Sequence, residues 1–303
     1  MGKARGERVD GVLLLDKPGG MTSNNVLQVA RRLLNAAKAG HTGTLDPMAT
    51  GLLPLTFGEA TKFAADLLDA DKSYRATLRL GMTTTTGDAE GDPVELRPVD
   101  VTDDEIDATL MSFTGCIEQV PPMHSALKRE GRPLYELARA GVTVERAPRP
   151  VEIRRLQRVA RAGDELVLEV DCSKGTYVRT LAEDIGRVLG CGAHLAALRR
   201  TRVGRLDLGG AVTLAALEQL APDQRRAQLR TVDALLESLP RVELDAELAR
   251  RFRLGQRLAI EAEPRGARVR VYAPDEELLG TASVTEWGVV APQRLISNER
   301  TPT

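Results

Sequence analysis

The stretch GHTGTLDPMATGLLPL, residues 40–55, decides how the surrounding chain is interpreted. It is dense in glycine, threonine and proline, and it carries one aspartate, Asp46, in the middle of a turn. We expect Gly40 to end the helix that comes before it, so that Asp46 lies in a loop. The apolar stripe of that helix is Val26, Val29, Ala30, Leu33 and Ala37.

Two interpretations of Asp46 compete at this point. An aspartate followed by proline is a common helix start, in which the carboxylate caps free N–H groups and proline takes the first helical position. A cap does not explain why residues 40–44, GHTGT, are all small or polar and let another molecule's backbone come close. The second interpretation is that the carboxylate stands at the mouth of an approachable surface.

Composition limits the class of protein. The chain has 303 residues, 42% hydrophobic and 28% charged, which is enough for one large domain and one small one. Aromatic residues are only 3%, so an exposed aromatic is a candidate for function. A formal net charge of -1 argues against a protein that binds polyanions with its whole surface.

Arginine is nevertheless concentrated in the C-terminal third of the chain. A single charged run usually marks a solvated face, but several runs in one region favour an anionic partner. The runs are RRTRVGR (199–205), RRAQLR (225–230), RRFRLGQR (250–257) and RGARVR (265–270).

The three cysteines, Cys116, Cys172 and Cys191, form no CxxC pair and are expected to be reduced thiols. The charged start MGKARGERVD is not followed by an apolar segment, and no run approaches the length of a membrane span. We therefore expect a cytoplasmic protein without membrane association.

Periodicity predicts an α+β fold. GVLLLDKPGG is expected to form a buried strand, and SYRATLRLG a half-buried strand with Tyr74 on its apolar face. Residues 101–113 form a helix with a capping box from Thr102 to Glu105. Residues 119–150 form an excursion that contains the short helix LYELARA.

The next segment is a strand, with Cys172 on its apolar face, followed by a helix. Arg179 lies in the first turn of that helix, where a cation is unfavourable for the helix dipole unless it has a partner. The apolar residues of this helix that are expected to face inward are Val178, Leu181, Ile185 and Val188. Short alternating strands after residue 237 predict a small β-domain.

Several of these segments also resemble motifs of one known protein family, and this resemblance implies an activity that the patterns alone do not. GHTGTLDPMATGLLPLTFGEATKF resembles, almost letter for letter, the catalytic motif of the TruB family of tRNA pseudouridine synthases. Other blocks resemble family motifs in the same order: GVLLLDKPGGMTS, DKSYRATLRLG, PPMHSALK, LYELARAG, CSKGTYVRTLAEDIG and CGAHLAALRR. The resemblance covers residues 11–205 and is weaker beyond them.

The resemblance implies a pseudouridine synthase core with a mostly antiparallel mixed sheet flanked by helices, in a catalytic domain at residues 1–237. The excursion at about 119–150 would close over RNA, and residues 238–303 would form a PUA-like RNA-binding domain. The implied reaction converts uridine 55 in the tRNA T-loop to pseudouridine, without cofactor or metal. The implied protein is a monomer with no obligate protein partner, which contacts the T-loop and the acceptor stem.

Residue by residue, Asp46 matches the family's essential aspartate. It would either add to the base or assist loss of the base and trap the sugar, and both routes stay open. Arg179 matches the arginine that pairs with this aspartate, and Tyr74 the stacking tyrosine that is a candidate for proton transfer at carbon 5 of uracil.

Further positions match family residues that contact substrate or support the site. His41 would fill the place of the flipped base, Leu198 would line the pocket, and Asp88 would join the charges around the arginine. Lys17 would brace the catalytic loop. The excursion would meet phosphates through Lys128, Arg129 and Arg132.

Two other classes of function compete with the synthase. The first is an RNA-folding chaperone that flips and releases T-loops, which would not need the carboxylate of Asp46. The second is a hydrolase that uses Asp46 as nucleophile, but no second acid and no GK[ST] phosphate loop accompany the motif. Cys191 and His194 are half of a zinc site without the other half.

Overall fold

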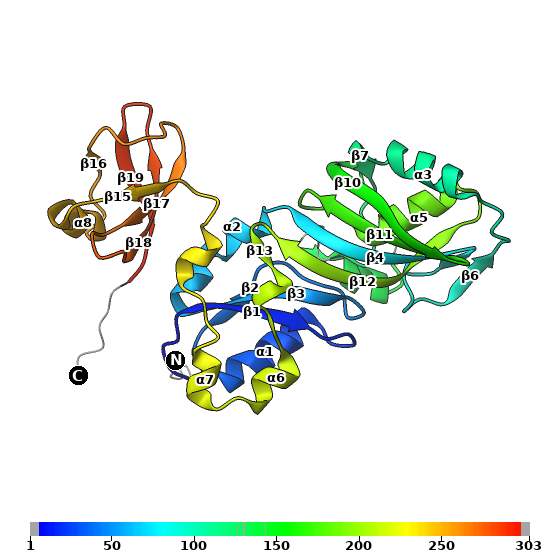
Figure 1. Cartoon of the computed structure of the whole chain (residues 1–303), viewed down its shortest axis with the longest axis horizontal. Helices are drawn as coiled ribbons and strands as arrows, with labels where there is room; N and C mark the ends of the chain where they lie inside the picture. The colour runs from blue at the N-terminus through cyan, green and yellow to red at the C-terminus, as the bar shows by residue number, and fades with distance from the viewer. Residues whose placement is uncertain (1–5, 126, 130, 143, 298–303) are drawn as a thin grey trace.

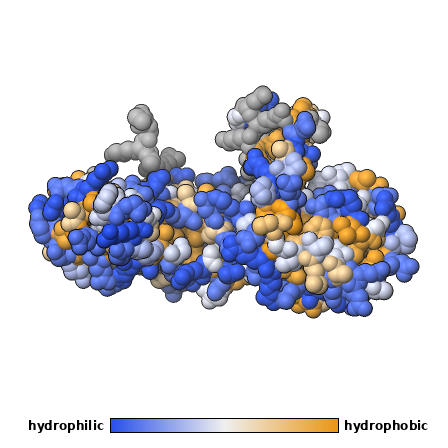
Figure 2. Space-filling model, turned by 90° about the horizontal axis from the view of Figure 1, so that it is seen from above, coloured by the Kyte–Doolittle hydropathy of each residue, from blue (hydrophilic) through white to orange (hydrophobic). Residues whose placement is uncertain are grey.

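A computed structural model describes residues 6–125, 127–129, 131–142 and 144–297. Figure 1 shows a large lobe built around one long sheet and a smaller β-rich lobe formed by the C-terminal part of the chain. In Figure 2 the visible face of the smaller lobe is mostly hydrophilic, while apolar side chains gather on the larger lobe. Within these described ranges no helix has the length and apolarity needed to cross a membrane.

The large lobe is organised by a ten-stranded sheet. Its strands are β1 (Gly11–Lys17), β2 (Ala39–His41), β3 (Thr50–Phe57), β4 (Lys72–Leu80), β7 (Gly115–Gln119), β10 (Arg149–Ala162), β11 (Glu165–Cys172), β12 (Ala193–Val203), β13 (Leu206–Asp207) and β14 (Val212–Thr213). Eight of them follow the order β14-β1-β3-β12-β4-β11-β10-β7, while β2 pairs with β3 and β13 with β12. Among these described strands β1 is parallel to β14 and β3 to β12, and the other pairs are antiparallel. The expected mostly antiparallel mixed sheet is confirmed.

Helices cover this sheet in two groups. The first is α1 (Ser23–Leu33) and α6 (Leu214–Gln219), which pack on β1 and β3 through a core of leucine, valine and alanine side chains. The second is α3 (Asp103–Ser112) and α5 (Val178–Val188), which pack on the half of the sheet that contains β4, β10, β11 and β12. The two halves of the sheet therefore have separate apolar cores under these helices, and a further apolar cluster, which includes Val12, Leu14, Leu52 and Phe63, packs on the other face of β1 and β3.

Short elements connect this framework. They are the 3-10 helices η1 (Gly58–Phe63), η2 (Leu208–Gly210) and η3 (Val232–Leu235), the helices α2 (Ala64–Leu68), α4 (Leu134–Arg139) and α7 (Pro222–Arg226), and the strands β5 (Met82–Thr84), β6 (Pro93–Leu96), β8 (Lys128–Arg129) and β9 (Arg132–Pro133). The excursion contains the β8–β9 hairpin and α4, so the expected short helix there is confirmed.

The structure confirms several local expectations. Each of them depends on a pattern within a few neighbouring residues, such as alternation in a strand or a helix cap. The segment that alternates around Tyr74 forms strand β4, as predicted. The segment whose apolar face ends in Cys172 forms strand β11. The N-terminus of α3 has the expected capping box, in which the Thr102 hydroxyl accepts from the Glu105 N–H and the Glu105 carboxylate accepts from the Thr102 N–H.

Three local expectations are wrong. The first helix ends at Leu33 rather than at Gly40, because Asn35 has a left-handed backbone (φ 51°), and residues 39–41 form β2 instead. No helix follows Asp46, since its carbonyl only accepts the Ala49 N–H in a turn before β3. Val188, expected inward, is 58% exposed at the end of α5.

The smaller lobe is a five-stranded sheet in the order β15-β17-β18-β19-β16. Its elements are β15 (Arg241–Glu243), α8 (Ala246–Arg253), β16 (Leu258–Ala259), β17 (Arg268–Tyr272), β18 (Leu278–Val284) and β19 (Val289–Leu295). It has its own apolar core, which includes Phe252 of α8 and Val271 of β17. The expected small β-rich, PUA-like domain is confirmed, although the expectation lacked α8, while the boundary at 237/238 remains a prediction.

Polar contacts join the two lobes. Arg268 of β17 forms an ion pair with Asp66 of α2, and the Tyr272 hydroxyl donates to Asp233 of η3 at 2.9 Å. Several arginines of the C-terminal runs are likewise held by carboxylates of this chain, among them Arg250 with Glu247, Arg253 with Glu277 and Arg265 with Glu263. Those runs are therefore partly neutralised within the protein itself.

The junction between β3 and β12 leaves no room for a side chain at Gly51. Gly51 has φ 100°, and a Cβ atom there would lie 2.2 Å from the carbonyl oxygen of Arg200. The two parallel strands are in register at this point, with Gly51 opposite Arg200 and Thr50 opposite Arg199. The close contact holds the two halves of the sheet together directly behind the loop of Asp46.

We expect Gly51→Ala to lower the free energy of unfolding by about 3 kcal/mol or more, because left-handed strain and a backbone clash add. Gly175→Ala is the matched control, since Gly175 has φ 82° but open space around it, and strain alone costs about 1 kcal/mol. Urea unfolding of the two variants measures both values. Equal losses would contradict the role given to the β3–β12 contact.

Candidate active site

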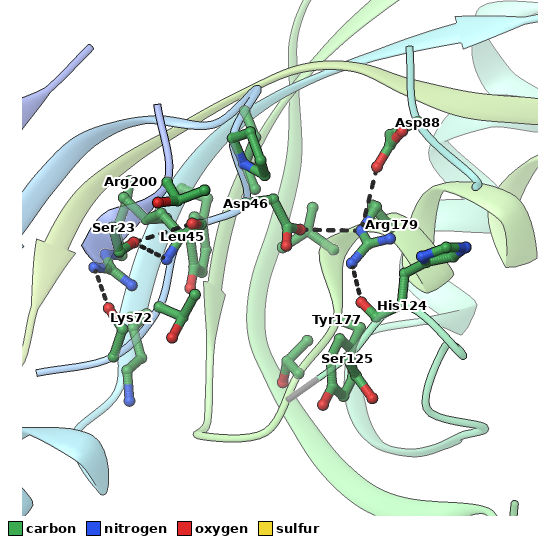
Figure 3. A pocket seen from close by; sticks show the side chains of 18 of the residues that line it. Ser23, Leu45, Asp46, Lys72, Asp88, His124, Ser125, Tyr177, Arg179 and Arg200 are labelled. Atoms are coloured by element: carbon green, nitrogen blue, oxygen red, sulfur yellow. Dashed lines mark hydrogen bonds and ion pairs between the residues drawn. The ribbon is translucent and has the colours of Figure 1, made fainter. Parts of the chain in front are cut away.

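A pocket of about 720 Å³ opens where the two halves of the large sheet meet (Figure 3). It is lined by the start of α1, the end of β2 and the loop after it, strand β4, the loop between β5 and β6, the start of the excursion, the turn that leads into α5 with the first turn of that helix, and strand β12. Asp46 lies among these lining residues, near the centre of the view in Figure 3, and 39% of its side chain is exposed. The geometry gives a carboxylate that solvent or a ligand can reach from one side.

Ser23 holds the loop before Asp46. Thr22 caps helix α1, since its hydroxyl accepts from the Asn25 N–H at 3.1 Å, and this leaves Ser23 free for another role. The Ser23 hydroxyl accepts from the Leu45 N–H at 2.8 Å and donates to the Leu45 carbonyl at 3.0 Å. The backbone of the residue before Asp46 is thus fixed to the start of a helix.

Lys17 holds the loop after Asp46. Its side chain is fully buried at the end of β1, and Nζ donates to the carbonyls of Pro18 (2.9 Å), Pro47 (3.1 Å) and Ala49 (2.6 Å). Burial lowers the pKa of this ammonium to about 8, and the charge of Asp46 opposes that shift. Together Ser23 and Lys17 fix the backbone on both sides of the carboxylate.

Arg179 connects the carboxylate to the rest of the pocket. Its Nε lies 3.1 Å from Oδ2 of Asp46 and 3.5 Å from Oδ2 of Asp88. Its terminal nitrogens donate to the carbonyls of Thr86 (3.3 Å) and His124 (2.7 Å). Only 6% of the side chain is exposed, so this first-turn cation is buried against its partners and is not solvated.

The second carboxylate, Asp88, is buried and supported by its own neighbours. The Thr86 hydroxyl donates to Oδ1 of Asp88 at 2.5 Å, and the Glu90 N–H donates to the same atom at 3.1 Å. Burial raises the pKa of Asp46, the charge of Arg179 opposes this, and the charge of Asp88 adds to the rise. Arg179 therefore favours the ionised form of Asp46, against the effect of burial.

Strands β4 and β12 contribute Tyr74, Leu198 and Arg200 to the lining of the pocket. Tyr74 and Arg200 face each other across the antiparallel pair β4–β12, and Leu198 is two residues before Arg200 on the same side. Burial raises the pKa of Tyr74, which favours the neutral form of its hydroxyl over the ionised form. A flat ligand in the pocket can therefore contact the tyrosine ring and the leucine side chain.

His41 lies at the rim, at the end of β2. Burial and then the charge of Arg200 lower its pKa, so the ring is neutral at pH 7. Its Nδ1 is buried without a hydrogen-bond partner among the described residues. A neutral aromatic ring at the mouth of the pocket is suited to stacking on another ring.

The structure therefore brings together most of the residues that the sequence indicates. Lys17 lies behind the loop instead of lining the pocket. Arg132 is exposed in the β8–β9 hairpin, whereas the side chains of Lys128 and Arg129 lie outside the described part of the chain. The pocket itself is lined by His41, Asp46, Tyr74, Asp88, Arg179 and Leu198.

Sequence reasoning missed several residues of the site. Arg200, Lys72 and Ser23 also line the pocket, and Arg200 was assigned only to a charged run. The alternation that starts at Leu198 would have placed Arg200 inward. Gln119 was also missed: its amide exchanges hydrogen bonds with the backbone N–H (3.0 Å) and carbonyl (3.3 Å) of Tyr177, just before α5.

The fold of this chain is similar to that of several solved structures. A Cbf5-Nop10-Gar1 complex covers 94% of this chain and 84% of its own, with a TM-score of 0.74 and 28% identity. An H/ACA RNP bound to a substrate RNA containing 2'-deoxyuridine covers 99% and 92%, with a TM-score of 0.73 and 25% identity. The fold of this chain is that of the pseudouridine synthases.

The sequence of this chain matches protein-family models and is similar to relatives of known name. Consecutive parts of the chain match the TruB family pseudouridylate synthase N-terminal domain (31–178), the tRNA pseudouridylate synthase B C-terminal domain (179–239) and the pseudouridine synthase II TruB C-terminal region (240–296). Proteins called tRNA pseudouridine synthase B from Aromatoleum aromaticum and Burkholderia mallei are each 60% identical, covering 97% and 95% of this chain and 94% and 97% of their own lengths. The chain belongs to the TruB family and is a pseudouridine synthase, an isomerase.

We expect Ser23→Ala to lower the free energy of unfolding by about 1–3 kcal/mol, because the buried backbone of Leu45 loses its partner for both polar groups. Ser112→Ala is the control, since that hydroxyl bonds only to the Thr109 carbonyl at the exposed end of α3, and its loss costs less than about 0.5 kcal/mol. Chemical denaturation compares the two. A Ser23 variant as stable as the Ser112 variant would contradict the role of Ser23 as a clamp.

Proposed function

We propose that this protein isomerises uridine 55 in the T-loop of tRNA to pseudouridine, with Asp46 as the nucleophile. The observation that carries the proposal is the Asp46–Arg179 pair, at 3.1 Å, on the wall of a pocket of about 720 Å³. That volume suits one nucleotide, and the fixed loop on both sides of Asp46 suits a carboxylate that must attack in one direction.

The target uridine is stacked in a folded loop and must leave it before it can react. Base flipping costs a few kcal/mol, which contacts elsewhere must offset. His41 supports this step because it is a neutral ring at the rim of the pocket. It would stack in the place that the uridine leaves, while the uracil lies between Tyr74 and Asp46.

Asp46 would then act on the flipped nucleotide. Arg179 keeps the carboxylate ionised against burial and fixes the direction of its Oδ1 and Oδ2 atoms. The carboxylate either adds to the uracil ring or assists its departure and traps the sugar. In both routes the uracil turns inside the pocket, rejoins the ribose through carbon 5, and loses the proton of that carbon.

Tyr74 is the proposed partner for this last proton. It lines the same pocket as the Asp46–Arg179 pair, so a uracil held in that pocket would lie close to Tyr74. The remaining pocket contacts come from Leu198, which would hold the apolar edge of the base, and Asp88, which holds Arg179.

Contacts with the rest of the tRNA would come from two regions. The excursion at about 119–150 would close over the T-loop, and the His124 carbonyl already joins it to Arg179. The phosphate contacts we assign to it are Lys128, Arg129 and Arg132. The C-terminal lobe would meet the acceptor stem, in a monomeric cytoplasmic enzyme that uses neither metal nor cofactor.

The first test uses tRNA whose uridines carry tritium at carbon 5. Isomerisation must release this tritium to water, so we expect the native protein to release it in proportion to tRNA. Asp46→Asn should slow release by at least about 10³-fold, because the nucleophile is lost. Asp164→Asn, which changes an exposed carboxylate paired with Arg79, should release tritium as the native protein does.

The same variants separate the synthase from a T-loop chaperone. A chaperone needs RNA binding but not the carboxylate of Asp46, so equal tRNA folding by Asp46→Asn and the native protein would show that both activities are present. Tight tRNA binding without tritium release by the native protein would contradict the synthase and leave the chaperone.

The pH dependence gives a second prediction. Activity should be lost as the pH falls through the pKa of Asp46, which burial raises above the ordinary value for aspartate. Asp88→Asn removes a negative charge that adds to this rise, so the acidic limb of kcat/KM should move to lower pH. A limb that moves to higher pH, or that moves equally in Asp164→Asn, would contradict the assignment to Asp46.

A further inference from the structure

Arg200 is a buried cation that the proposed mechanism does not use. Its side chain is 1% exposed, and it lines the pocket on the side of Asp46 away from Arg179 in Figure 3. Nε donates to the Leu52 carbonyl at 2.8 Å, and one terminal nitrogen donates to the Gly43 carbonyl at 3.2 Å. These two hydrogen bonds fix the guanidinium between strand β3 and the loop that carries Asp46.

The charge of Arg200 has no carboxylate partner among the described residues. Arg179, in the same pocket, has two carboxylates within 3.5 Å, whereas the hydrogen bonds of Arg200 to the backbone go to neutral carbonyls. Burying an unpaired charge is costly, and a neutral amide could donate to the same two carbonyls. The hydrogen bonds alone therefore do not explain why this position carries a charge.

The neighbours of Arg200 show which group gains from its charge. Lys72 of β4, His41 of β2 and Lys17 of β1 are cationic or neutral, and Arg200 disfavours their protonated forms. Asp46 is already paired with Arg179. Tyr74 is directly opposite Arg200 across β4–β12, at a register where paired side chains on one face are neighbours, and it can become an anion.

We infer that Arg200 is a positioning residue whose unpaired charge stabilises the ionised form of Tyr74, so that this tyrosine can take the proton from carbon 5. The inference rests on the proposed function. In this step the phenolate oxygen accepts the proton, and the electrons of the C5–H bond restore the conjugated uracil ring. The phenol then returns the proton to water, which regenerates the phenolate.

Electrostatics agrees with this geometry. Burial raises the pKa of Tyr74, and the charge of Arg200 is the largest influence that opposes the rise. Cys172 of β11 and Asp46 of the loop both act against ionisation of the phenol, and Lys72 lies on the same strand. Burial and these charges together still favour the neutral phenol, and removing Arg200 would favour it further.

The experiment titrates Tyr74 in the free enzyme by ultraviolet difference absorbance, with Tyr74→Phe subtracted to isolate its signal. Arg200→Gln keeps amide donors for the Gly43 and Leu52 carbonyls but removes the charge. We expect the apparent pKa of Tyr74 to rise by about 1–3 pH units in Arg200→Gln. Arg202→Gln, two residues along β12 and bonded to the Ser73 hydroxyl, should leave this titration unchanged.

A kinetic measurement on the same variants completes the test. Single-turnover tritium release by Arg200→Gln should be about 10-fold to 10³-fold slower at neutral pH, one factor of ten per unit of pKa, and should recover as the pH is raised. A purely structural role predicts an equal loss at every pH. That result, or a folded Arg200→Gln in which Tyr74 titrates as in the native protein, would overturn the inference.

Two controls keep the result interpretable. If Arg200→Gln does not fold, Arg200→Lys retains the charge, and Tyr74 should then titrate within about one pH unit of its native value, with a larger rise overturning the inference. Tritium release by the native protein is measured in the same series. Its failure would contradict the proposed function, while the titration of Tyr74 judges the role of Arg200 without any RNA.

Discussion

The ion pair between Asp46 and Arg179 is the interaction on which the arrangement of the site depends. Arg179 is almost fully buried, and its guanidinium joins four segments by contacting two carboxylates and two backbone carbonyls. Removing any of these partners would leave a buried polar group unsatisfied, which is costly in an apolar surrounding. The loop of Asp46, the loop of Asp88, the excursion and helix α5 are therefore held in one geometry by a single side chain.

The framework around this pair is rigid for separate reasons. Ser23 and Lys17 fix the backbone on either side of Asp46, and the contact of Gly51 with Arg200 joins the two halves of the sheet behind it. These contacts come from β1, α1, β3 and β12, which the two apolar cores hold in place. A reactive carboxylate needs such support, because small displacements of a reacting group are costly for rate.

The pocket also contains two arginines with different surroundings. Arg179 is neutralised by carboxylates, whereas Arg200 keeps an unpaired charge beside Tyr74. Two arginines of one pocket thus favour negative charge at two places, the carboxylate of Asp46 and the phenol oxygen of Tyr74. Such a division agrees with a reaction that needs a nucleophile on one side of a base and proton removal on the other.

The sequence by itself determined the features that short-range patterns control. Alternation placed Tyr74 on the apolar face of β4, the Thr102 capping box started α3, and the motif around Asp46 pointed to the family. Only the tertiary structure decided that Asp46 starts no helix, that Ser23 holds the backbone of Leu45, and that Arg200 is buried. The reason is physical: a charged run or an Asp-Pro pair has the same local chemistry whether it faces water or a pocket. The partners that decide between these, such as Leu52 for Arg200 and Arg179 for Asp46, lie more than a hundred residues away in the chain.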